Sequence, residues 1–303
     1  MVFSDAAGRW LEYANLSRRE KTARFRRSKV AILVSFFGAM RLREINPTRI
    51  EYFQRRRTAT VASATVNAEW WILRAILKRF GAWTEVHAQI SRPLPVQKES
   101  RGRALSAQER QNLLACAERN SRWKRELLPI IVLALHTGLR SGELRGIRLR
   151  DIFLDAEPRA RLAIRRASTK TAAGERLVML DKSAVAALRV LLIISHGRGA
   201  RRPEHFLFPR YIRGGGWDPQ RNQGTWTTGW RSLRRAAGLA DLRFHDLRHT
   251  YITMGAEGGV ALDVMMRQVG HINPTQTRDY VHIGESAVSD AVEVIEKRFE
   301  QTS

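Results

Sequence analysis

The stretch SRPLPVQKESRGRA, residues 91–104, divides the sequence into two parts of different character. It contains two prolines, one glycine and five charged side chains, and its apolar residues follow neither helical nor strand spacing. Proline and glycine interrupt regular structure, so this composition is typical of a connection between domains. We therefore predict a linker at residues 93–104, between one domain at 1–92 and a second at 105–303.

The part before the linker has apolar residues at helical spacing. The two clearest series are Val30, Leu33, Val34, Phe37 and Met40, and then Val66, Trp70, Leu73, Leu77 and Phe80. Gly81 follows the second series, and glycine is the residue that most often ends a helix. We predict an all-helical N-terminal domain, with Arg74 and Lys78 interleaved in its second series and a basic segment, Arg55, Arg56 and Arg57, between the two helices.

The part after the linker has a mixed pattern. Ser106 and Glu109 have the spacing of a capping box, which predicts a helix that begins near residue 107. This helix is predicted to cover residues 107–119. Further helices are predicted near residues 124–136, 182–194, 227–237, 245–256, 261–269 and 287–299. Residues 161–164 and 176–180 read as two strands joined by a turn, and 211–225 as a loop. The expected fold class is α+β, mainly α with a small β-sheet.

The charge points to a polyanionic partner. The 303 residues carry 53 Lys or Arg and 29 Asp or Glu, a formal net charge of +24. The excess is denser in residues 1–100, which hold 19 basic and 8 acidic side chains. Nucleic acid is the commonest polyanion, and the planar fork of arginine suits phosphate. A basic surface without a partner, or one that binds acidic membranes, remains the alternative at this point.

The cysteine content and the apolar runs favour a cytoplasmic protein without a membrane segment. Cys116 is the single cysteine of the sequence, so no intramolecular disulfide can form, as is usual in a reducing compartment. No signal peptide is visible. The longest apolar stretch, residues 127–135, is interrupted by Pro129 and is too short to span a bilayer.

Five short segments contain the residues that could carry chemistry. They are HTGLRSGEL at 136–144, TKT at 169–171, HDLRHT at 245–250, Gly270 with His271, and Tyr280. Taken singly, each has an ordinary interpretation: Arg140 as a helix cap, Lys170 as a solvated residue of a turn, and Tyr280 as a half-buried aromatic residue.

A zinc site is the first alternative for the histidines. His245 and His249 are one helical turn apart, so both side chains lie on the same face of a helix. Zinc hydrolases with such a pair have Glu at the second position, where this sequence has Asp246, and no third ligand is evident. The fixed charge of Arg248 in the same turn would repel a cation. We therefore expect no metal.

Together the segments fit the transfer of a phosphodiester. Attack on the phosphate places negative charge on two non-bridging oxygens, which Arg140 and Arg248 can bind in pairs of hydrogen bonds. A tyrosine hydroxyl is a usable nucleophile, but its ordinary pKa is about 10, so Tyr280 needs a cationic field and a proton acceptor. Arg248 and His245 can supply these.

Two further groups complete the expected site. Lys170, in a turn between strands, can protonate the departing 5′ oxygen. His271 can donate another hydrogen bond to the phosphate.

This set resembles the tyrosine recombinase (phage integrase) family. The similar segments are the TGLRxxEL box, the TKT turn, HxLRHT, GH, and a tyrosine nine positions after that histidine, together with residues 65–83, TVNAEWWILRAILKRFGAW. The resemblance implies Arg140, Lys170, His245, Arg248, His271 and Tyr280 as the catalytic set. Glu143 and His249 match positions that support the site. Val269 and Met179 depart from the family pattern, which often has Leu and Pro there, without changing a catalytic group.

The resemblance also implies a fold and an activity. A helical core-binding domain and a breaking-rejoining catalytic domain would form a clamp on duplex DNA, with Arg55, Arg56, Arg57, Arg74 and Lys78 as DNA-binding residues of the first. The enzyme would be a site-specific recombinase or integrase of a mobile genetic element. It would act through a 3′-phosphotyrosine intermediate, without metal, ATP or another cofactor.

The implied assembly is a homotetramer on two DNA sites, in which the helix at 287–299 docks either on a neighbouring protomer or on its own chain. Two alternatives remain open for the activity. A type IB topoisomerase-like enzyme uses the same chemistry to relax DNA, and a non-catalytic DNA-binding protein would only bind it.

Overall fold

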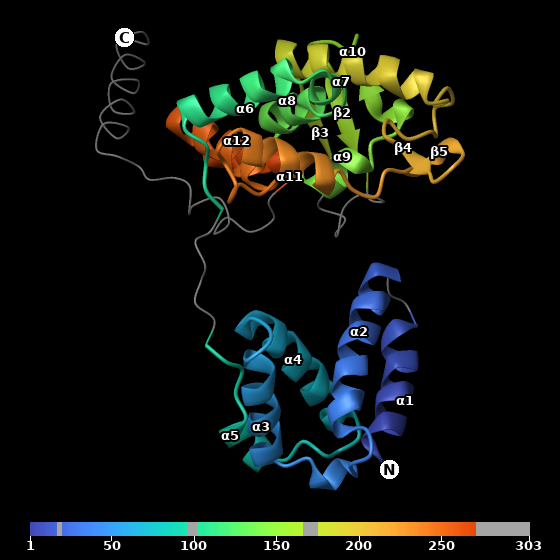
Figure 1. Ribbon diagram of the computed structural model, residues 1–303, viewed down its shortest axis with the longest axis vertical. Coiled ribbons are helices and arrows are strands. Elements are labelled where there is room, and N and C mark those ends of the chain that lie inside the picture. Colours follow the sequence, from blue (N-terminus) through green and yellow to red (C-terminus); the bar gives the residue numbers. More distant parts are fainter. Residues whose placement is uncertain (17–19, 96–101, 166–174, 271–303) are drawn as a thin grey trace, which may run out of the picture. The chain divides into compact units, whose positions relative to one another are not determined.

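The computed structural model describes residues 1–16, 20–95, 102–165 and 175–270. The chain divides into two compact units, Met1–Glu99 and Ser100–Ser303, each with its own elements (Figure 1). The division falls inside the stretch 93–104. The chain is held by its own unit near each end of that stretch: Nδ2 of Asn67 donates to the carbonyl of Leu94, and the N–H of Leu105 donates to Oγ1 of Thr250.

The first unit is helical in its described residues. Its elements are α1 (Phe3–Asn15), α2 (Glu20–Phe37), a 3-10 turn η1 (Leu42–Glu44), α3 (Pro47–Thr58), α4 (Ser63–Arg79) and α5 (Glu85–Ile90). The helices α1, α2 and α4 pack on one another (Figure 1). A buried aromatic and aliphatic cluster fills the space between the helices, with Phe37, Phe53 and Leu73 fully buried. The predicted all-helical character is confirmed.

The basic segment lies between α2 and α4 in the chain, as predicted, and it belongs to a further helix, α3. Arg55, Arg56 and Arg57 form the last turn of α3. The helix begins where the side chain of Asn46 accepts the N–H of Arg49, with Pro47 in the first turn. Proline there is compatible with a helix, because its missing N–H has no intrahelical partner in any case. Cationic side chains in the last turn also interact favourably with the helix dipole.

The second unit combines helices with two small sheets. Its helices are α6 (Ala107–Arg119), α7 (Ser121–Glu126), α8 (Leu128–Thr137), α9 (Ser141–Arg145), α10 (Lys182–Gly197), α11 (Thr227–Ala236), α12 (Asp246–Glu257) and α13 (Leu262–Val269), with a 3-10 turn η2 (Leu149–Asp151). Its strands are β1 (Ile152–Phe153), β2 (Arg161–Ile164), β3 (Arg176–Met179), β4 (Pro209–Ile212) and β5 (Gly216–Asn222). The predicted fold class, mainly α with a small sheet, is confirmed.

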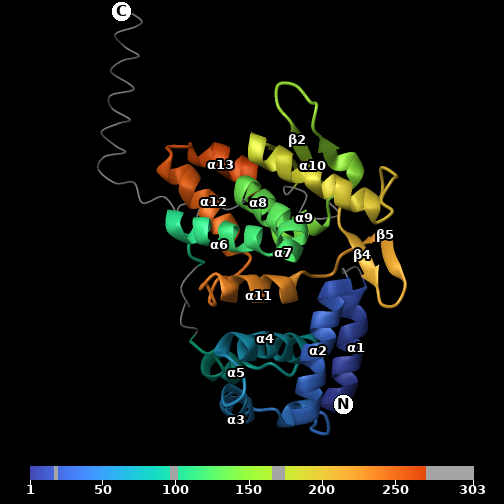
Figure 2. The same cartoon turned by 45° about the horizontal axis from the view of Figure 1, so that its top comes forward.

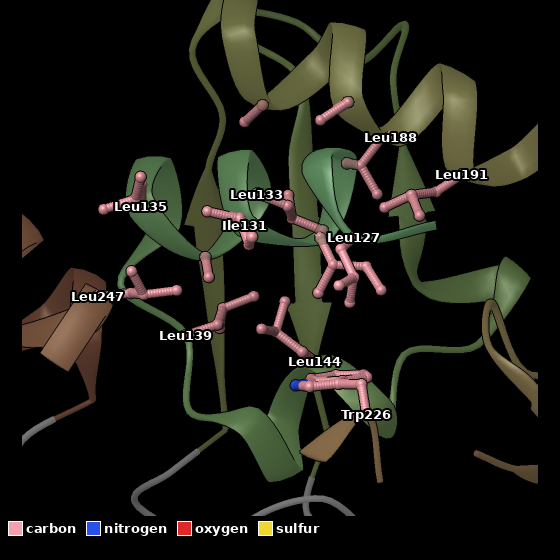
Figure 3. Close-up of a cluster of buried hydrophobic side chains, with 14 of the residues drawn as sticks. Leu127, Ile131, Leu133, Leu135, Leu139, Leu144, Leu188, Leu191, Trp226 and Leu247 are labelled. Carbon is pink, nitrogen blue, oxygen red and sulfur yellow. The ribbon is translucent and has the colours of Figure 1, made fainter. Parts of the chain in front are cut away.

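Helix α8 is the centre of the second core. It is apolar almost all round, which is typical of a helix buried on all sides. It packs against α6, α7, α10 and α12 (Figure 2). Figure 3 shows Ile131 and Leu133 of α8 in the same cluster as Leu188 and Leu191 of α10. This core fixes the end of α8, from which the site described below begins.

The start of the second unit agrees with the sequence, but one helix is divided. Ser106 accepts the N–H of Glu109, and the Glu109 carboxylate accepts the N–H of Ser106, which confirms the capping box. The predicted helix 124–136 is instead α7 and α8, separated at Leu127. Pro129 lies in the first turn of α8 and cannot donate a hydrogen bond to a preceding turn, so a continuous helix is interrupted here.

The two predicted strands pair as expected. β2 is antiparallel to β3, with Leu162 opposite Val178, and β1 adds a short third strand beside β2. Leu162 and Val178 are fully buried, whereas the alternate positions are more exposed. The turn that contains Lys170 lies outside the described residues.

The predicted loop at 211–225 is wrong. Residues 209–212 and 216–222 form an antiparallel hairpin, β4–β5, with a register shift between Pro209 and Arg210. Its strands lack the apolar alternation by which a half-buried strand is recognised, because most of their side chains face solvent. A cross-strand ring pair, Tyr211 and Trp217 at 5.3 Å, stabilises it.

Candidate functional site

The described structure contains part of the predicted site. Arg140, Glu143, His245, Arg248 and His249 lie around the N-terminal ends of α9 and α12. Lys170, His271 and Tyr280 lie outside the described residues, as does the predicted helix at 287–299.

Gly138 forms the turn that carries Arg140. Helix α8 ends at Thr137, and Gly138 follows in the left-handed region with φ 61°. A Cβ atom there would lie 2.6 Å from Cδ1 of Tyr251, so backbone conformation and space both favour glycine. The chain then reverses, and Arg140 becomes the N-cap residue of α9. Arg140 is therefore not a solvated cap on the helix before it.

The Arg140 side chain is held from two directions. Its Nη1 donates to Oε1 of Glu143 at 2.9 Å, and its backbone N–H donates to Oε2 of the same carboxylate at 2.9 Å. Its Nη2 donates to the carbonyl oxygen of Gly270 at 3.2 Å. The side chain is still 38% exposed. The guanidinium group is thus oriented and remains open to an anion.

Arg248 is anchored on the same turn. It lies in the first turn of α12, is 2% exposed, and donates from Nη1 to the carbonyl oxygen of Gly138 at 2.7 Å. That carbonyl is only two residues from Arg140, which belongs to a segment far from α12 in the sequence. Arginine keeps its charge at any ordinary pH. The fold therefore brings two permanent positive charges to one short turn.

Two histidines at the start of α12 have a lowered pKa. The rings of His245 and His249 lie 4.9 Å apart and perpendicular to each other. Loss of hydration, and then the charges of Arg248 and Arg140, lower the pKa of His245, although its side chain still reaches solvent. Loss of hydration, and then the neighbouring His245, lower the pKa of His249 to about 4. A neutral imidazole can accept a proton.

A buried carboxylate joins the site to a residue that the sequence did not single out. Glu143 is 2% exposed, and besides Arg140 it pairs with Arg176 of β3, from whose Nη2 its Oε2 lies 3.0 Å away. Burial would raise the pKa of Glu143, but the hydrogen bond and charge of Arg176, with those of Arg140, hold it below its usual value. The sequence signal that could have indicated an inward-facing Arg176 is the strand period. Arg176 is two residues from the inward-facing Val178, so both side chains lie on the same face of the strand.

The predicted DNA-binding residues of the first unit differ in their surroundings. Arg57 pairs with the fully buried Glu69, through Nε at 2.8 Å and Nη2 at 2.9 Å. Arg74 lies over three indole rings, the nearest that of Trp71 at 5.3 Å. The side chains of Arg55, Arg56 and Lys78 are exposed. Arg74 and these three exposed residues have cationic groups near the surface. Arg57 differs from them because its guanidinium group already has an anionic partner.

Comparison with known proteins decides the family. Residues 103–286 match the phage integrase family. The chain belongs to this family. The matched range contains the whole of the predicted catalytic set, from Arg140 to Tyr280. Membership confirms the predicted class of activity, site-specific recombination of DNA by strand cleavage and rejoining.

Relatives in this phage integrase family match almost the full chain. Tyrosine recombinase XerA of Saccharolobus solfataricus is 24% identical over 284 residues, which cover 93% of this chain and 81% of the relative. The integrase of Salmonella phage P22 is 22% identical over 99% of this chain and 81% of its own length.

Solved structures of integrases share the fold. The Tn1549 transposon integrase in complex with a circular intermediate DNA has a TM-score of 0.75 at 17% identity, and covers 97% of this chain and 99% of its own. A lambda integrase dimer bound to a COC′ core site has a TM-score of 0.67 at 18% identity, and covers 94% and 97% respectively. At these identities the likeness concerns the fold.

The described residues of this integrase contain neither a metal-binding cluster nor a membrane-spanning helix. No three or more His, Cys, Asp or Glu side chains among them are grouped so as to hold a metal ion. Within the same part of the chain, no helix has both the length and the apolar surface that crossing a bilayer requires.

Proposed function

We propose that this integrase cleaves DNA with Tyr280 as the nucleophile, while Arg140 and Arg248 bind the phosphate under attack. The observation that carries this assignment is the anchoring of both guanidinium groups at one turn, through the Gly138 carbonyl and the Glu143 carboxylate. Two fixed cations stabilise the charge that develops on the non-bridging oxygens, and they need no reorganisation during the reaction.

The bonds exchange in one transesterification. The Tyr280 oxygen forms a bond to phosphorus as the bond from phosphorus to the 5′ oxygen breaks, which leaves a 3′-phosphotyrosine and a free 5′-hydroxyl. The proton of Tyr280 passes to His245, whose lowered pKa keeps it neutral and ready to accept. Lys170 protonates the departing 5′ oxygen, and His271 donates to the phosphate.

The second half of the reaction reverses these roles. A 5′-hydroxyl from a partner duplex attacks the phosphotyrosine, so the bond energy is retained and no ATP is consumed. Exchange between two duplexes requires four active sites, which supports a homotetramer at synapsis. The related integrase structures contain DNA, and the net charge of +24 suits the same partner here. We assign the protein to the cytoplasm, where such DNA is found.

Trapping of the covalent intermediate tests this proposal. The substrate is a library of nicked duplexes with random sequence around the nick. Cleavage near the nick releases a short DNA fragment with the 5′-hydroxyl, so that hydroxyl cannot religate the strand and the adduct accumulates. Wild-type protein should give an SDS-resistant adduct, and sequencing of the trapped DNA should identify the target site. Tyr280→Phe should give none, because it lacks the attacking oxygen.

The matched control is Tyr211→Phe, which removes a hydroxyl from an exposed tyrosine of the β4–β5 hairpin and should retain the adduct. An adduct that persists in Tyr280→Phe contradicts the assignment. Absence of an adduct from wild-type protein that still binds the library favours a non-catalytic DNA-binding protein. Relaxation of a supercoiled plasmid without exchange between duplexes favours the topoisomerase-like alternative.

A further inference from the structure

Arg176 is a buried cation beside the catalytic arginines. It begins β3, and its side chain is 5% exposed. In the sequence it lies six residues after Lys170. Burial of a charged side chain is unfavourable unless the charge is paired and hydrogen-bonded, so its contacts indicate what the burial achieves.

One side of the Arg176 guanidinium group holds Glu143. Nη2 donates to Oε2 at 3.0 Å and Nη1 to Oε1 at 3.3 Å, so the two planar groups face each other as a fork. The same carboxylate oxygens accept the side chain and the backbone N–H of Arg140. The carboxylate is therefore oriented by one arginine while it orients the other.

The other side of Arg176 holds the end of α13. Its Nε donates to the carbonyl oxygen of Gln268 at 2.9 Å. The Gln268 side chain adds two hydrogen bonds to the backbone of Met179, at 3.2 and 2.9 Å. β3 and the last turn of α13 are thus tied together at three points, directly before Gly270 and His271 in the chain.

Gly270 allows this close approach. It has φ 70°, and a Cβ atom at that position would lie 2.6 Å from Nη1 of Arg176. Its carbonyl oxygen accepts Nη2 of Arg140. Only a glycine fits between the two arginines without moving one of them.

We propose that Arg176 is a positioning residue for strand cleavage. It fixes Arg140 through Glu143, and it ties the start of β3 to the last turn of α13 through the Gln268 carbonyl. The start of α9, the start of β3 and the end of α13 are thereby held together by a single guanidinium group. This inference rests on the proposed function, because Arg176 acts on groups assigned to that reaction.

The test combines three variants: Arg176→Met, Glu143→Gln, and both together. Arg176→Met leaves the Glu143 charge buried beside one cation, so it should lower both the thermal midpoint and the cleavage rate. The double variant removes that charge, so it should recover most of the thermal midpoint. Its rate of adduct formation at saturating enzyme should stay about 100-fold below wild type, as displacement of a catalytic group by about 1 Å predicts.

A merely structural role for Arg176 predicts a different pattern. The Arg176→Met variant would then cleave at the wild-type rate when it is assayed well below its thermal midpoint, and that result overturns the proposal. A positioning role also predicts non-additivity: the double variant should be about as slow as either single variant. Arg176→Lys should be intermediate, because lysine keeps the charge but not the fork.

Arg198→Met is the matched control within the same unit. Arg198 is also a largely buried arginine, 3.5 Å from a carboxylate oxygen of Glu126 and 3.9 Å from the Trp217 ring centroid. Its loss should lower the thermal midpoint and leave the cleavage rate within about twofold, since Glu126 and Trp217, which it contacts, are not among the described residues of the site.

Hydrogen exchange separates this inference from the proposed function. Without DNA, the amides of residues 140–143 and 268–270 should exchange faster in the double variant and remain unchanged in Arg198→Met. Unchanged exchange in the double variant overturns the positioning role, whether or not the protein cuts DNA. Faster exchange in a protein whose wild type forms no adduct supports the positioning role and rejects the proposed function.

Discussion

Each unit of this integrase contains a buried glutamate between two cations. In the first unit, Glu69 of α4 is fully buried and pairs with Lys29 of α2 and Arg57 of α3. In the second, Glu143 pairs with Arg140 and Arg176. The pKa of both carboxylates lies below its usual value, in each case because hydrogen bonds and cation charges outweigh the cost of burial.

The two clusters differ in what their cations contact next. Around Glu69, Arg57 donates further only to Thr60 of the segment after its own helix, among the contacts of the described residues. Around Glu143, both arginines also donate to backbone carbonyls at the end of α13. The same chemistry therefore joins three helices in one unit, and in the other it aligns groups that we propose to act on a phosphate.

The largest effect is expected for Arg140→Ala. Loss of a guanidinium group that stabilises the charge on the transferred phosphate should reduce the cleavage rate about 1,000-fold. The thermal midpoint should fall less than in Arg176→Met, because this side chain is 38% exposed and the buried Arg176 still pairs with Glu143. Adduct formation in single turnover and calorimetry check the two parts. A rate within tenfold of wild type at full binding would remove Arg140 from the catalytic set.

Arg57→Met should have the opposite profile. Glu69 would remain fully buried with Lys29 as its cation, and loss of one partner of a buried ion pair is expected to destabilise the first unit by about 3 kcal/mol. Unfolding in denaturant, monitored through the hydrogen exchange of residues 20–79, measures this loss of stability. The cleavage rate at saturating DNA should stay near wild type; a rate loss as large as that of Arg140→Ala would show that the two clusters are not distinct in role.

Acid should affect the second unit before either glutamate is protonated. The folded pKa of His249 is about 4, below the unfolded value of about 6.5. The unfolded chain therefore binds the proton first, and stability present above pH 6.5 is lost as the pH falls toward 4. Between pH 7 and pH 5 the loss should be about 2 kcal/mol.

Thermal unfolding at several pH values, with hydrogen exchange of α12, measures this loss. His249→Gln should flatten the dependence over that range, and His196→Gln, at an exposed position in α10, should not. Equal slopes for wild type and His249→Gln would contradict the expected cause.

The smallest effect concerns DNA affinity. Arg56 is exposed, so Arg56→Gln should reduce the slope of log affinity against log salt by about 0.9 on a mixed-sequence duplex. Arg57→Gln should reduce it less, since Glu69 already neutralises that guanidinium group. Fluorescence anisotropy between low and moderate salt compares the two. Equal reductions would mean that Arg57 leaves Glu69 to bind phosphate.

Much of the described site was predictable from sequence. Arg140, His245 and Arg248 follow from residue types whose joint presence fits one reaction, and Glu143 follows from the family resemblance. The structure brings these four to neighbouring helix ends. Helix α12 is also predictable, because helical periodicity is a local feature, whereas the short helix α9 was not predicted.

Arg176 and the β4–β5 hairpin were not predictable in the same way. The contact of Arg176 with Glu143 depends on strand pairing and on the packing of α13, neither of which leaves a local pattern. In the hairpin, pairing is set by cross-strand hydrogen bonds, and the side chains of Arg210 and Arg221 face solvent. Propensity and hydrophobic period carry little information about such strands.

The attachment of Arg140 to the Gly270 carbonyl spans 130 residues, and that of Arg248 to Gly138 spans 110. During synthesis, the ribosome must translate past residue 270 before both guanidinium groups have their anchors. A chain that ends before Gly270 keeps the Gly138 carbonyl that anchors Arg248 but lacks the carbonyl that holds Nη2 of Arg140. One of the two guanidinium groups would then be less restrained than in the full chain.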